Sequence, residues 1–302
     1  MTSAIETNGL TRRFGRLEAV HGLNLSVPEG SVFALVGPNG AGKTTTIKLL
    51  MNLVNPTSGT ARVLGVESRR LGPATLARIG YVSENQQLPG WLSTDGFLDY
   101  LRPFYPTWDE RLCRTLRSDL GLTARTPLRV QSRGTRMKTA LLASLAYRPE
   151  LVILDEPFTG LDPMVRDELI RALLELPGEQ TCTMLISSHD IEEVERLADW
   201  IGFLQDGRLV IAEPVESLLR RFCMVEVAFP ETVGTMPAND RWLPQGAVGR
   251  MLRFVDTDHS SPEATARISA AFPGADIRDS PMSLREIFVA LARHAVSSAE
   301  AV

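Results

Sequence analysis

A glycine-rich segment early in the chain has the residue types and the spacing that bind phosphate groups. It reads Gly37-Pro38-Asn39-Gly40-Ala41-Gly42-Lys43-Thr44 and matches the pattern GxxxxGK[ST]. Glycines let backbone N–H groups turn inward around phosphate oxygens, the lysine reaches the β- and γ-phosphates, and the threonine hydroxyl can ligate Mg²⁺. The run SVFALVG before the segment predicts a buried strand, and KTTTIKLLMNLV predicts a helix. We therefore expect a nucleotide phosphate site between a strand and a helix.

A second element supplies carboxylates. The run LVILDE places Asp155 and Glu156 at the end of a buried hydrophobic strand. Asp155 would hold a metal ion through water, and Glu156 would orient or deprotonate an attacking water. An apolar strand that ends in Asp-Glu is common and can be purely structural. Beside a phosphate-binding loop, the pattern favours nucleotide hydrolysis.

The elements that must position these residues alternate along the chain. Buried-type strands at 151–155 and 182–188 flank a helical segment at 162–175, which predicts an α/β fold with a largely parallel sheet covered on both faces. Residues 85–150 are expected to be mostly helical. Near Arg220 the pattern changes to strand, loop at 230–249, strand, helix, short strand and helix. The predicted domains are therefore residues 1–220, with a helical subdomain at 85–150, and a small α+β appendage at 221–302.

Composition excludes several classes of protein. The 302 residues carry a net charge of −4 and are 44% hydrophobic, which argues against disorder and against nucleic acid as a partner. Arginines at 12, 13, 16, 69, 70 and from 125 to 136 are too dispersed to predict a basic patch. The three cysteines form no CxxC pair and predict reduced thiols without a metal. No run approaches the roughly 20 apolar residues that cross a bilayer, so the chain is expected to be cytosolic unless a partner holds it at a membrane.

Further segments carry a family resemblance. PFTGLDP follows Glu156, Gln131-Ser132-Arg133-Gly134-Thr135 precedes Asp155, and Ser188-His189-Asp190 follows the next strand. Residues from about 4 to 215 resemble the nucleotide-binding domain of ABC transporters almost end to end. The resemblance implies a P-loop NTPase fold of the ABC-ATPase type, with an antiparallel β-subdomain and a helical subdomain that carries the signature motif.

The resemblance also assigns cofactors and roles by matching positions. ATP and Mg²⁺ are the implied cofactors, and the phosphate loop binds the nucleotide together with Thr45 on the α-phosphate. Thr44 and Asp155 fall at the metal. Lys43, Glu156 and His189 are the residues expected to carry hydrolysis. His189 would contact the γ-phosphate, although a polar loop residue at this place can also be merely structural.

Other positions concern the base and the second subunit. Phe14 falls where the family has an aromatic ring that stacks on adenine, and the alternative is a core aromatic of the β-subdomain. Ser132 and Gly134 are expected to approach the γ-phosphate of ATP bound to the opposite protomer. Asp162 is expected at the interface between the two protomers. The active form would be a homodimer, or a heterodimer with a similar ATPase.

Two positions depart from the family pattern. Glu84 stands where the family has a glutamine that contacts the metal and water, and a carboxylate can also ligate Mg²⁺. In the signature motif, Arg133 replaces the first glycine and Thr135 replaces the glutamine. Ser132 and Gly134, the phosphate-contacting positions, remain. The departures leave the turnover rate open.

The basic signature resembles that of the ABC-2-type branch, which is linked to export. FYPTWD at 104–109 and SLREIF at 283–288 resemble this branch as well, although the second segment equally fits a generic amphipathic helix with an N-cap serine. The implied function is ATP-driven transport through a separate transmembrane permease, with the chain peripheral on the inner face of the cell membrane. A soluble ABC ATPase that remodels nucleic acid or ribosomes is the alternative, but no heptad insertion or basic tail supports it. A GTPase or kinase would leave Ser132, Gly134 and His189 unexplained.

Residues 85–108 contain six aromatic side chains. Most of them are expected to pack inside the helical subdomain. Trp91, together with residues 88–92, is expected to form part of a groove for a helix of the membrane subunit, because exposed apolar side chains rimmed by polar ones suit docking.

Overall fold

The computed structural model describes residues 2–122, 125–176, 182–230 and 236–300, the last six of these in backbone only. The chain forms two compact units, Met1–Ala212 and Glu213–Val302. This boundary lies slightly before the one predicted at 220. Among the described residues, no helix combines the length and the apolar character that crossing a bilayer requires.

A small sheet opens the first unit and is antiparallel in every pairing that the structure gives. Its strand order is β2-β1-β5-β6, with β3 also paired to β1. Along β1 the burial pattern largely alternates, so that one face packs on the core and the other meets solvent. The strands are β1 (Ser3–Phe14), β2 (Leu17–Leu23), β3 (Ser26–Pro28), β5 (Ser58–Val63) and β6 (Val66–Glu67). This is the β-subdomain that the family resemblance implied.

A six-stranded sheet forms the centre of the first unit, with strand order β11-β10-β4-β9-β8-β7. The five strands from β10 to β7 run parallel. Buried residues fill β8 and β9, as both-face coverage requires. The strands are β4 (Val32–Val36), β7 (Ile79–Ser83), β8 (Leu151–Asp155), β9 (Thr183–Ser188), β10 (Trp200–Gln205) and β11 (Arg208–Pro214). The parallel sheet expected from the sequence is confirmed.

The register of this sheet brings the predicted motifs to one edge. Val36, which ends β4, pairs with Ser188 at the end of β9. Asp155 at the end of β8 pairs with Ser187 on one side and with Ser83 on the other. Because parallel strands end at the same edge, the segments that follow β4, β7, β8 and β9 emerge side by side.

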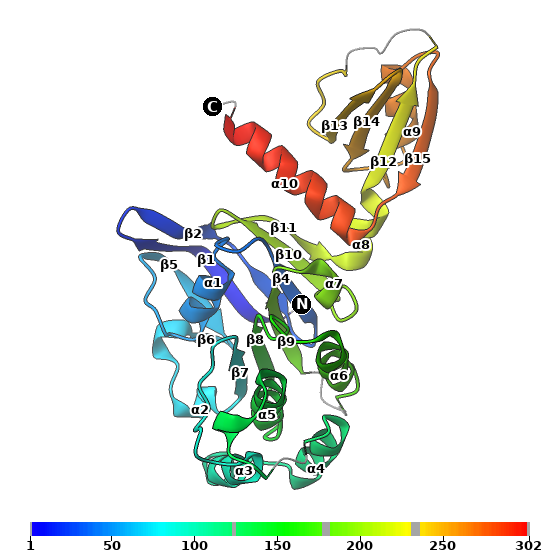
Figure 1. Cartoon of the computed structure of the whole chain (residues 1–302). Helices are drawn as coiled ribbons and strands as arrows, with labels where there is room; N and C mark the ends of the chain where they lie inside the picture. The colour runs from blue at the N-terminus through cyan, green and yellow to red at the C-terminus, as the bar shows by residue number, and fades with distance from the viewer. Residues whose placement is uncertain (1, 123–124, 177–181, 231–235, 301–302) are drawn as a thin grey trace. The chain divides into compact units, whose positions relative to one another are not determined.

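Helices pack around this sheet, and helices also make up much of the segment that connects β7 to β8. Polar side chains cap several of their N-termini, with Ser93, Asp109, Ser132 and Asp162 each accepting a hydrogen bond from the first turn. Figure 1 shows α3, α4 and α5 gathered at one end of the first unit. The helices are α1 (Lys43–Leu50), α2 (Pro73–Leu76), α3 (Thr94–Leu101), α4 (Glu110–Asp119), α5 (Arg133–Leu145), α6 (Pro163–Leu174) and α7 (Ile191–Val194), with 3₁₀ turns at Ser68–Arg70, Arg102–Phe104 and Leu128–Val130.

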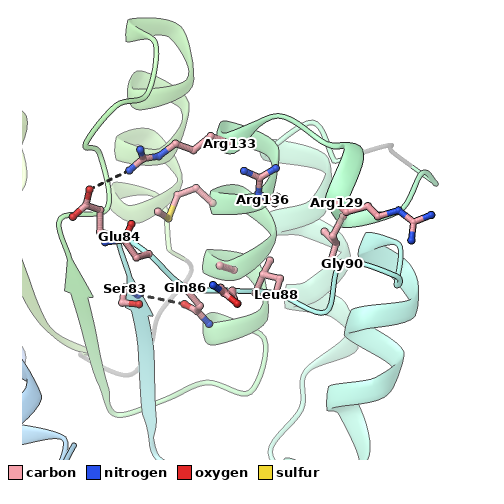
Figure 2. A pocket seen from close by; sticks show the side chains of 13 residues that line it. Ser83, Glu84, Gln86, Leu88, Gly90, Arg129, Arg133 and Arg136 are labelled. Atoms are coloured by element: carbon pink, nitrogen blue, oxygen red, sulfur yellow. Dashed lines mark hydrogen bonds and ion pairs between the residues drawn. The ribbon is translucent and has the colours of Figure 1, made fainter. Parts of the chain in front are cut away.

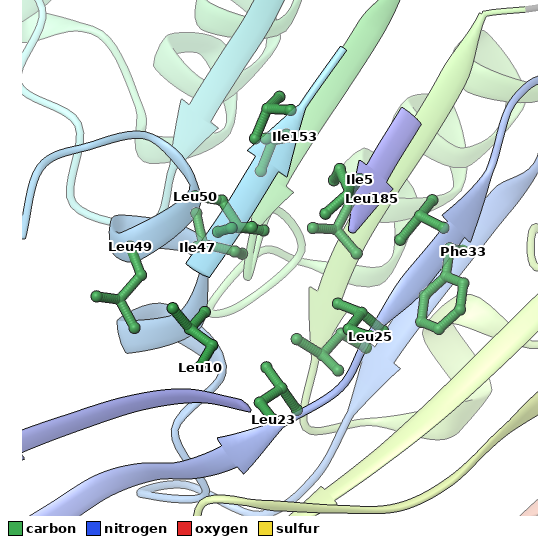
Figure 3. Close-up of a cluster of buried hydrophobic side chains, with 14 of the residues drawn as sticks. Ile5, Leu10, Leu23, Leu25, Phe33, Ile47, Leu49, Leu50, Ile153 and Leu185 are labelled. Carbon is green, nitrogen blue, oxygen red and sulfur yellow. The ribbon is translucent and has the colours of Figure 1, made fainter. Parts of the chain in front are cut away.

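The main core of the first unit joins the two sheets and α1. Figure 3 shows Leu10 and Leu23 of the small sheet converging with Ile47 and Leu50 of α1 and Leu185 of β9. Each of these side chains is at most 1% exposed. Fully burying one such side chain stabilises the fold by about 1.5–3 kcal/mol. This core fixes the angle between the β4 strand and α1, and hence the position of the loop between them.

The aromatic residues at 91–108 are less buried than the sequence suggested. Phe97 is buried and Tyr105 and Trp108 are half-buried, but Trp91, Tyr100 and Phe104 are exposed. Tyr100 and Phe104 pack against one another at the surface, with ring centroids 5.6 Å apart. The expectation that most of the six pack inside the helical subdomain was therefore wrong. Some of these rings lie at its surface instead, where Tyr100 and Phe104 pack against each other.

The second unit is a four-stranded antiparallel sheet with order β13-β14-β12-β15 and helices. Trp242, Phe254 and Phe272 form an aromatic centre in its core. Ser283 and Glu286 cap the last helix reciprocally through two hydrogen bonds to backbone N–H groups. The elements are α8 (Val215–Arg221), β12 (Cys223–Ala228), β13 (Trp242–Val248), β14 (Met251–Asp256), α9 (Ala264–Ala271), β15 (Asp276–Pro281) and α10 (Leu284–Glu300).

One prediction for this unit is wrong. Residues 242–248 fall in the Pro- and Gly-bearing loop predicted at 230–249, but they form β13. The strand lies at an edge of the sheet, where proline is tolerated, and its register shifts between Pro244 and Gly246. Part of the predicted loop, residues 231–235, lies outside the described residues.

Candidate nucleotide site

The phosphate-binding loop connects β4 to α1 in a conformation that only glycine permits at two points. A Cβ atom on Gly37 would lie 2.1 Å from the Leu204 carbonyl oxygen, and one on Gly42 would lie 2.3 Å from the Ala19 carbonyl oxygen. Gly42 also has a φ of +104°, which L-residues rarely adopt. The Lys43 ammonium folds back over the loop and donates to the carbonyl oxygens of Gly37 (2.7 Å) and Pro38 (3.2 Å).

Asp155 and Thr44, two of the three predicted metal ligands, lie together. The Thr44 hydroxyl donates to Asp155 Oδ1 at 3.1 Å, and the Ser187 hydroxyl donates to the same oxygen at 2.7 Å. Burial raises the pKa of Asp155, and the hydrogen bonds from Ser187 and Thr44 oppose that rise. A hydroxyl beside a carboxylate offers the hard oxygen donors that Mg²⁺ prefers, so the donor set fits this ion.

Glu156 lies at the centre of a buried charged cluster. Its φ of +51° is in the left-handed region, which is uncommon for a residue with a side chain. Its Oε1 lies 3.1 Å from Lys43 Nζ, and its Oε2 lies 2.8 Å from His189 Nδ1. Thr159 Oγ1 donates to Oε2 at 2.9 Å. Burial by itself would raise the pKa of Glu156, but the hydrogen bond to His189 and the charge of Lys43 outweigh it and hold that pKa below its ordinary range.

A hollow of about 550 Å³ lies over these groups. Its lining residues come from five separate segments of the sequence, which include Phe14, residues 39–45, Glu84, Glu156 and His189. Phe14 is 45% exposed, so the alternative that it belongs to the core of the β-subdomain is wrong. The Arg12 guanidinium lies over one face of the Phe14 ring, 4.4 Å from its centre, in a cation–π contact.

The signature residues lie apart from this hollow. Ser132 caps α5 by accepting a hydrogen bond from the Thr135 N–H at 3.1 Å. A Cβ atom on Gly134 would lie 2.9 Å from Val165 Cγ1 at the start of α6, so the two helix starts approach closely. Neither Ser132 nor Gly134 is among the described residues that line the hollow. Asp162 caps α6 through its bond from the Val165 N–H at 3.1 Å.

Comparison with known proteins decides the family. The ABC transporter domain model matches residues 20–159. The bacitracin transport ATP-binding protein BcrA of Enterococcus faecalis is 34% identical over 226 residues, which cover 73% of this chain and 72% of BcrA. This chain is an ATP-binding subunit of the ABC transporter family. The ABC transporter ATP-binding protein YtrB of Bacillus subtilis is 26% identical over 286 residues, 95% of this chain and 97% of YtrB, so that match includes the second unit.

Two further comparisons agree. The daunorubicin/doxorubicin resistance ATP-binding protein DrrA of Streptomyces peucetius is 37% identical over 223 residues, 70% of this chain and 65% of DrrA. The solved ATP-binding cassette MJ0796, bound to ADP and Pi, has a TM-score of 0.61 at 22% identity and covers 70% of this chain and 98% of that one. The likeness to MJ0796 shows the shared fold. ABC ATP-binding subunits bind nucleotide, dimerise and work with membrane permeases.

The first unit of this ATP-binding subunit has a groove at part of the segment predicted for docking, since Leu88 and Gly90 line it, whereas Trp91 is not among its described lining residues. The groove has a volume of about 500 Å³ and lies between the loop after β7 and the start of α5, as Figure 2 shows. Arg129, Arg133 and Arg136 all line it, opposite Glu84. The sequence could not predict a basic patch among the arginines at 125–136, and the structure brings three of them to the lining of one groove. The 3₁₀ turn at Leu128–Val130 places Arg129 in the lining, with its guanidinium directed away from those of Arg133 and Arg136 in Figure 2, and no sequence periodicity reveals that turn.

Proposed function

We propose that this subunit hydrolyses ATP to power ABC-2-type export through a separate transmembrane permease at the cytoplasmic face of the membrane. The observation that carries the hydrolytic part is the meeting of Lys43, Glu156 and His189 in one hollow with the Thr44–Asp155 pair. The export part is supported by relatives named for bacitracin transport and for daunorubicin/doxorubicin resistance. A soluble ATPase that remodels nucleic acid or ribosomes finds no support among these relatives.

The charged cluster suggests how binding and hydrolysis are coupled. The Glu156 carboxylate is the anion that Lys43 and His189 both contact. An incoming γ-phosphate offers both cations a stronger anionic partner. Glu156 is then released toward the water that attacks the phosphate, and its lowered pKa keeps it ionised as a base. Mg²⁺, held by Thr44 and Asp155 with Glu84 nearby, would neutralise charge on the phosphates.

The separation of the signature residues from the hollow supports a dimer. Ser132 and Gly134 do not reach the phosphate loop of their own chain among the described contacts. A second protomer arranged head to tail would place its own Ser132 and Gly134 over that nucleotide. The proposed active form is therefore a homodimer, or a heterodimer with a similar ATPase, that encloses two nucleotides.

The groove beside Glu84 is the proposed docking site for the permease. Its lining carries three arginines and one glutamate, so its charge complements an acidic side chain on a cytoplasmic helix. Leu88 and Gly90 extend the lining, and the next residue, Trp91, is 74% exposed. An exposed tryptophan beside a polar groove is a suitable anchor for such a helix.

Docking is tested with Trp91→Glu. Because Trp91 is exposed and lies outside the hollow, the basal ATPase of the isolated subunit should stay near the wild-type rate. Co-purification with the permease should fall by about tenfold or more, the loss typical of an aromatic hot spot. Phe104→Glu, a change of another exposed aromatic outside the groove, is the matched control and should retain co-purification. Retained co-purification by Trp91→Glu would place the docking site elsewhere.

Hydrolysis is tested by phosphate release from the purified chain. Release should require both ATP and Mg²⁺, and Lys43→Ala should weaken ATP binding because it removes positive charge from the phosphates. Glu156→Gln should still bind ATP but leave it intact. A Glu156→Gln chain that hydrolyses ATP at the wild-type rate would remove Glu156 as the base.

A further inference from the structure

The two residues that depart from the family pattern contact one another. Glu84 follows β7, and Arg133 begins α5, 49 residues later. Arg133 Nη2 donates to Glu84 Oε1 at 3.4 Å, an ion pair drawn as a dashed line in Figure 2. A glutamine and a glycine at these positions could not form it. The two changes are therefore complementary in charge and in place.

The Arg133 guanidinium also touches the loop that carries the base. A Cβ atom on Gly160 would lie 2.9 Å from Arg133 Nη1, so the guanidinium packs closely against the backbone there. Gly160 directly follows Thr159, whose hydroxyl donates a hydrogen bond to Glu156 Oε2 at 2.9 Å. Arg133 thus lies where the loop after β7, the loop after β8 and the signature helix meet.

Glu84 itself faces two spaces. It lines the hollow that contains the phosphate loop, and it also lines the arginine groove. Arg133 lines the groove and not the hollow. The ion pair therefore ties one carboxylate oxygen of Glu84 to a side chain on the groove side.

We propose that Arg133 is a positioning residue for Glu84, holding its carboxylate on the groove side until closure of the dimer draws the guanidinium toward ATP on the partner protomer. This inference rests on the proposed function. Arg133 directly follows Ser132, so movement of the signature motif onto a triphosphate carries the guanidinium toward strong negative charge. Glu84 then becomes free for the metal, and each site gains its last oxygen ligand only when the partner arrives.

The strength of the pair suits an exchange of this kind. The two side chains are 42% and 35% exposed. An ion pair that remains so accessible to water contributes little stability and is readily given up for a better partner. A triphosphate is such a partner for arginine.

The test measures binding of Mn²⁺ with ADP by electron paramagnetic resonance of the isolated subunit, because ADP does not drive closure. Arg133→Gln should tighten Mn²⁺ binding by about two- to fivefold, the range of an exposed ion pair. Glu84→Gln should leave it near the wild-type value, because Arg133 already holds the Glu84 carboxylate on the groove side in the open subunit, and adding Arg133→Gln to Glu84→Gln should change nothing further. Arg133→Lys should behave like wild type because lysine keeps the charge. Arg111→Gln, an exposed arginine of α4, controls for net charge.

Each outcome decides a separate question. Mn²⁺ binding by Arg133→Gln that is equal to or weaker than that of the wild type overturns the positioning role. The role is also overturned if Arg133→Gln still tightens Mn²⁺ binding when Glu84 is already glutamine. Circular dichroism of each variant confirms that it is folded. Failure of the wild-type chain to bind Mn²⁺ with ADP would instead refute the proposed nucleotide site.

Discussion

Glu156→Gln should change ATP affinity and ATP hydrolysis in opposite directions. Glu156 pairs with Lys43 at 3.1 Å and with His189 at 2.8 Å, and it is only 6% exposed. ATP must displace this carboxylate from both cations before the phosphates can occupy their place. Glutamine keeps the shape of the side chain but removes the competing charge.

The magnitude follows from the burial of the cluster. Desolvation cancels much of the attraction in a buried ion pair, so the net competition removed is about 1–2 kcal/mol. ATP affinity should therefore rise by about five- to thirtyfold. Loss of the general base should lower the hydrolysis rate by about 10²–10⁴-fold.

Two measurements separate these effects. Isothermal titration with ATP gives the affinity, and phosphate release under saturating ATP gives the rate. Glu156→Asp is the matched control, because it keeps the charge and should not show the gain in affinity. A Glu156→Gln chain with weaker ATP binding would refute the competition inferred from the Lys43 and His189 contacts.

Two further predictions concern stability. Gly134→Ala should lower the free energy of unfolding by about 1–3 kcal/mol, because the added methyl group would overpack against Val165. Adding Val165→Ala should recover part of that loss in denaturant titrations. If the losses of the two substitutions simply add, the clash is contradicted. Asp109→Ala should lower the free energy of unfolding by about 1 kcal/mol at pH 7, because Asp109 caps α4 and pairs with Arg148. Since the α4 backbone bond and then Arg148 lower the pKa of Asp109, its stabilisation is present above a pH of about 4 and lost below it. Denaturation at several pH values should therefore show the difference shrinking in acid, and a constant difference would exclude the ionised cap.

The parts of the site that sequence could predict are those attached to ends of parallel strands. The phosphate loop follows β4, Asp155 ends β8 and His189 follows β9, and the strand order places these three ends next to one another. Each motif was recognisable alone because its glycines or its apolar strand is local in the sequence. Their meeting follows from the sheet, which the alternation of strands and helices also predicted.

Contacts between side chains that are far apart in the sequence could not be predicted from these local patterns. The pairing of Glu156 with Lys43 and the pairing of Glu84 with Arg133 depend on how loops close over the sheet edge. Glu84 and Arg133 were each noted as a departure, but nothing in local periodicity indicates that they touch. The edge strand β13 was missed for a related reason, since proline lowers strand propensity locally and only its edge position makes it tolerable.

The central claim is that ATP closes two copies of the nucleotide site on each other, and light scattering of Glu156→Gln tests it most directly. The chain has a mass of 33.2 kDa. Without nucleotide, or with ADP, the particle should have that mass. With saturating Mg-ATP, the mass should double, because Ser132 and Gly134 of each protomer then contact the ATP of the other. A particle that remains at the monomer mass in saturating Mg-ATP, both alone and mixed with a paralogous ATPase, would contradict the mechanism.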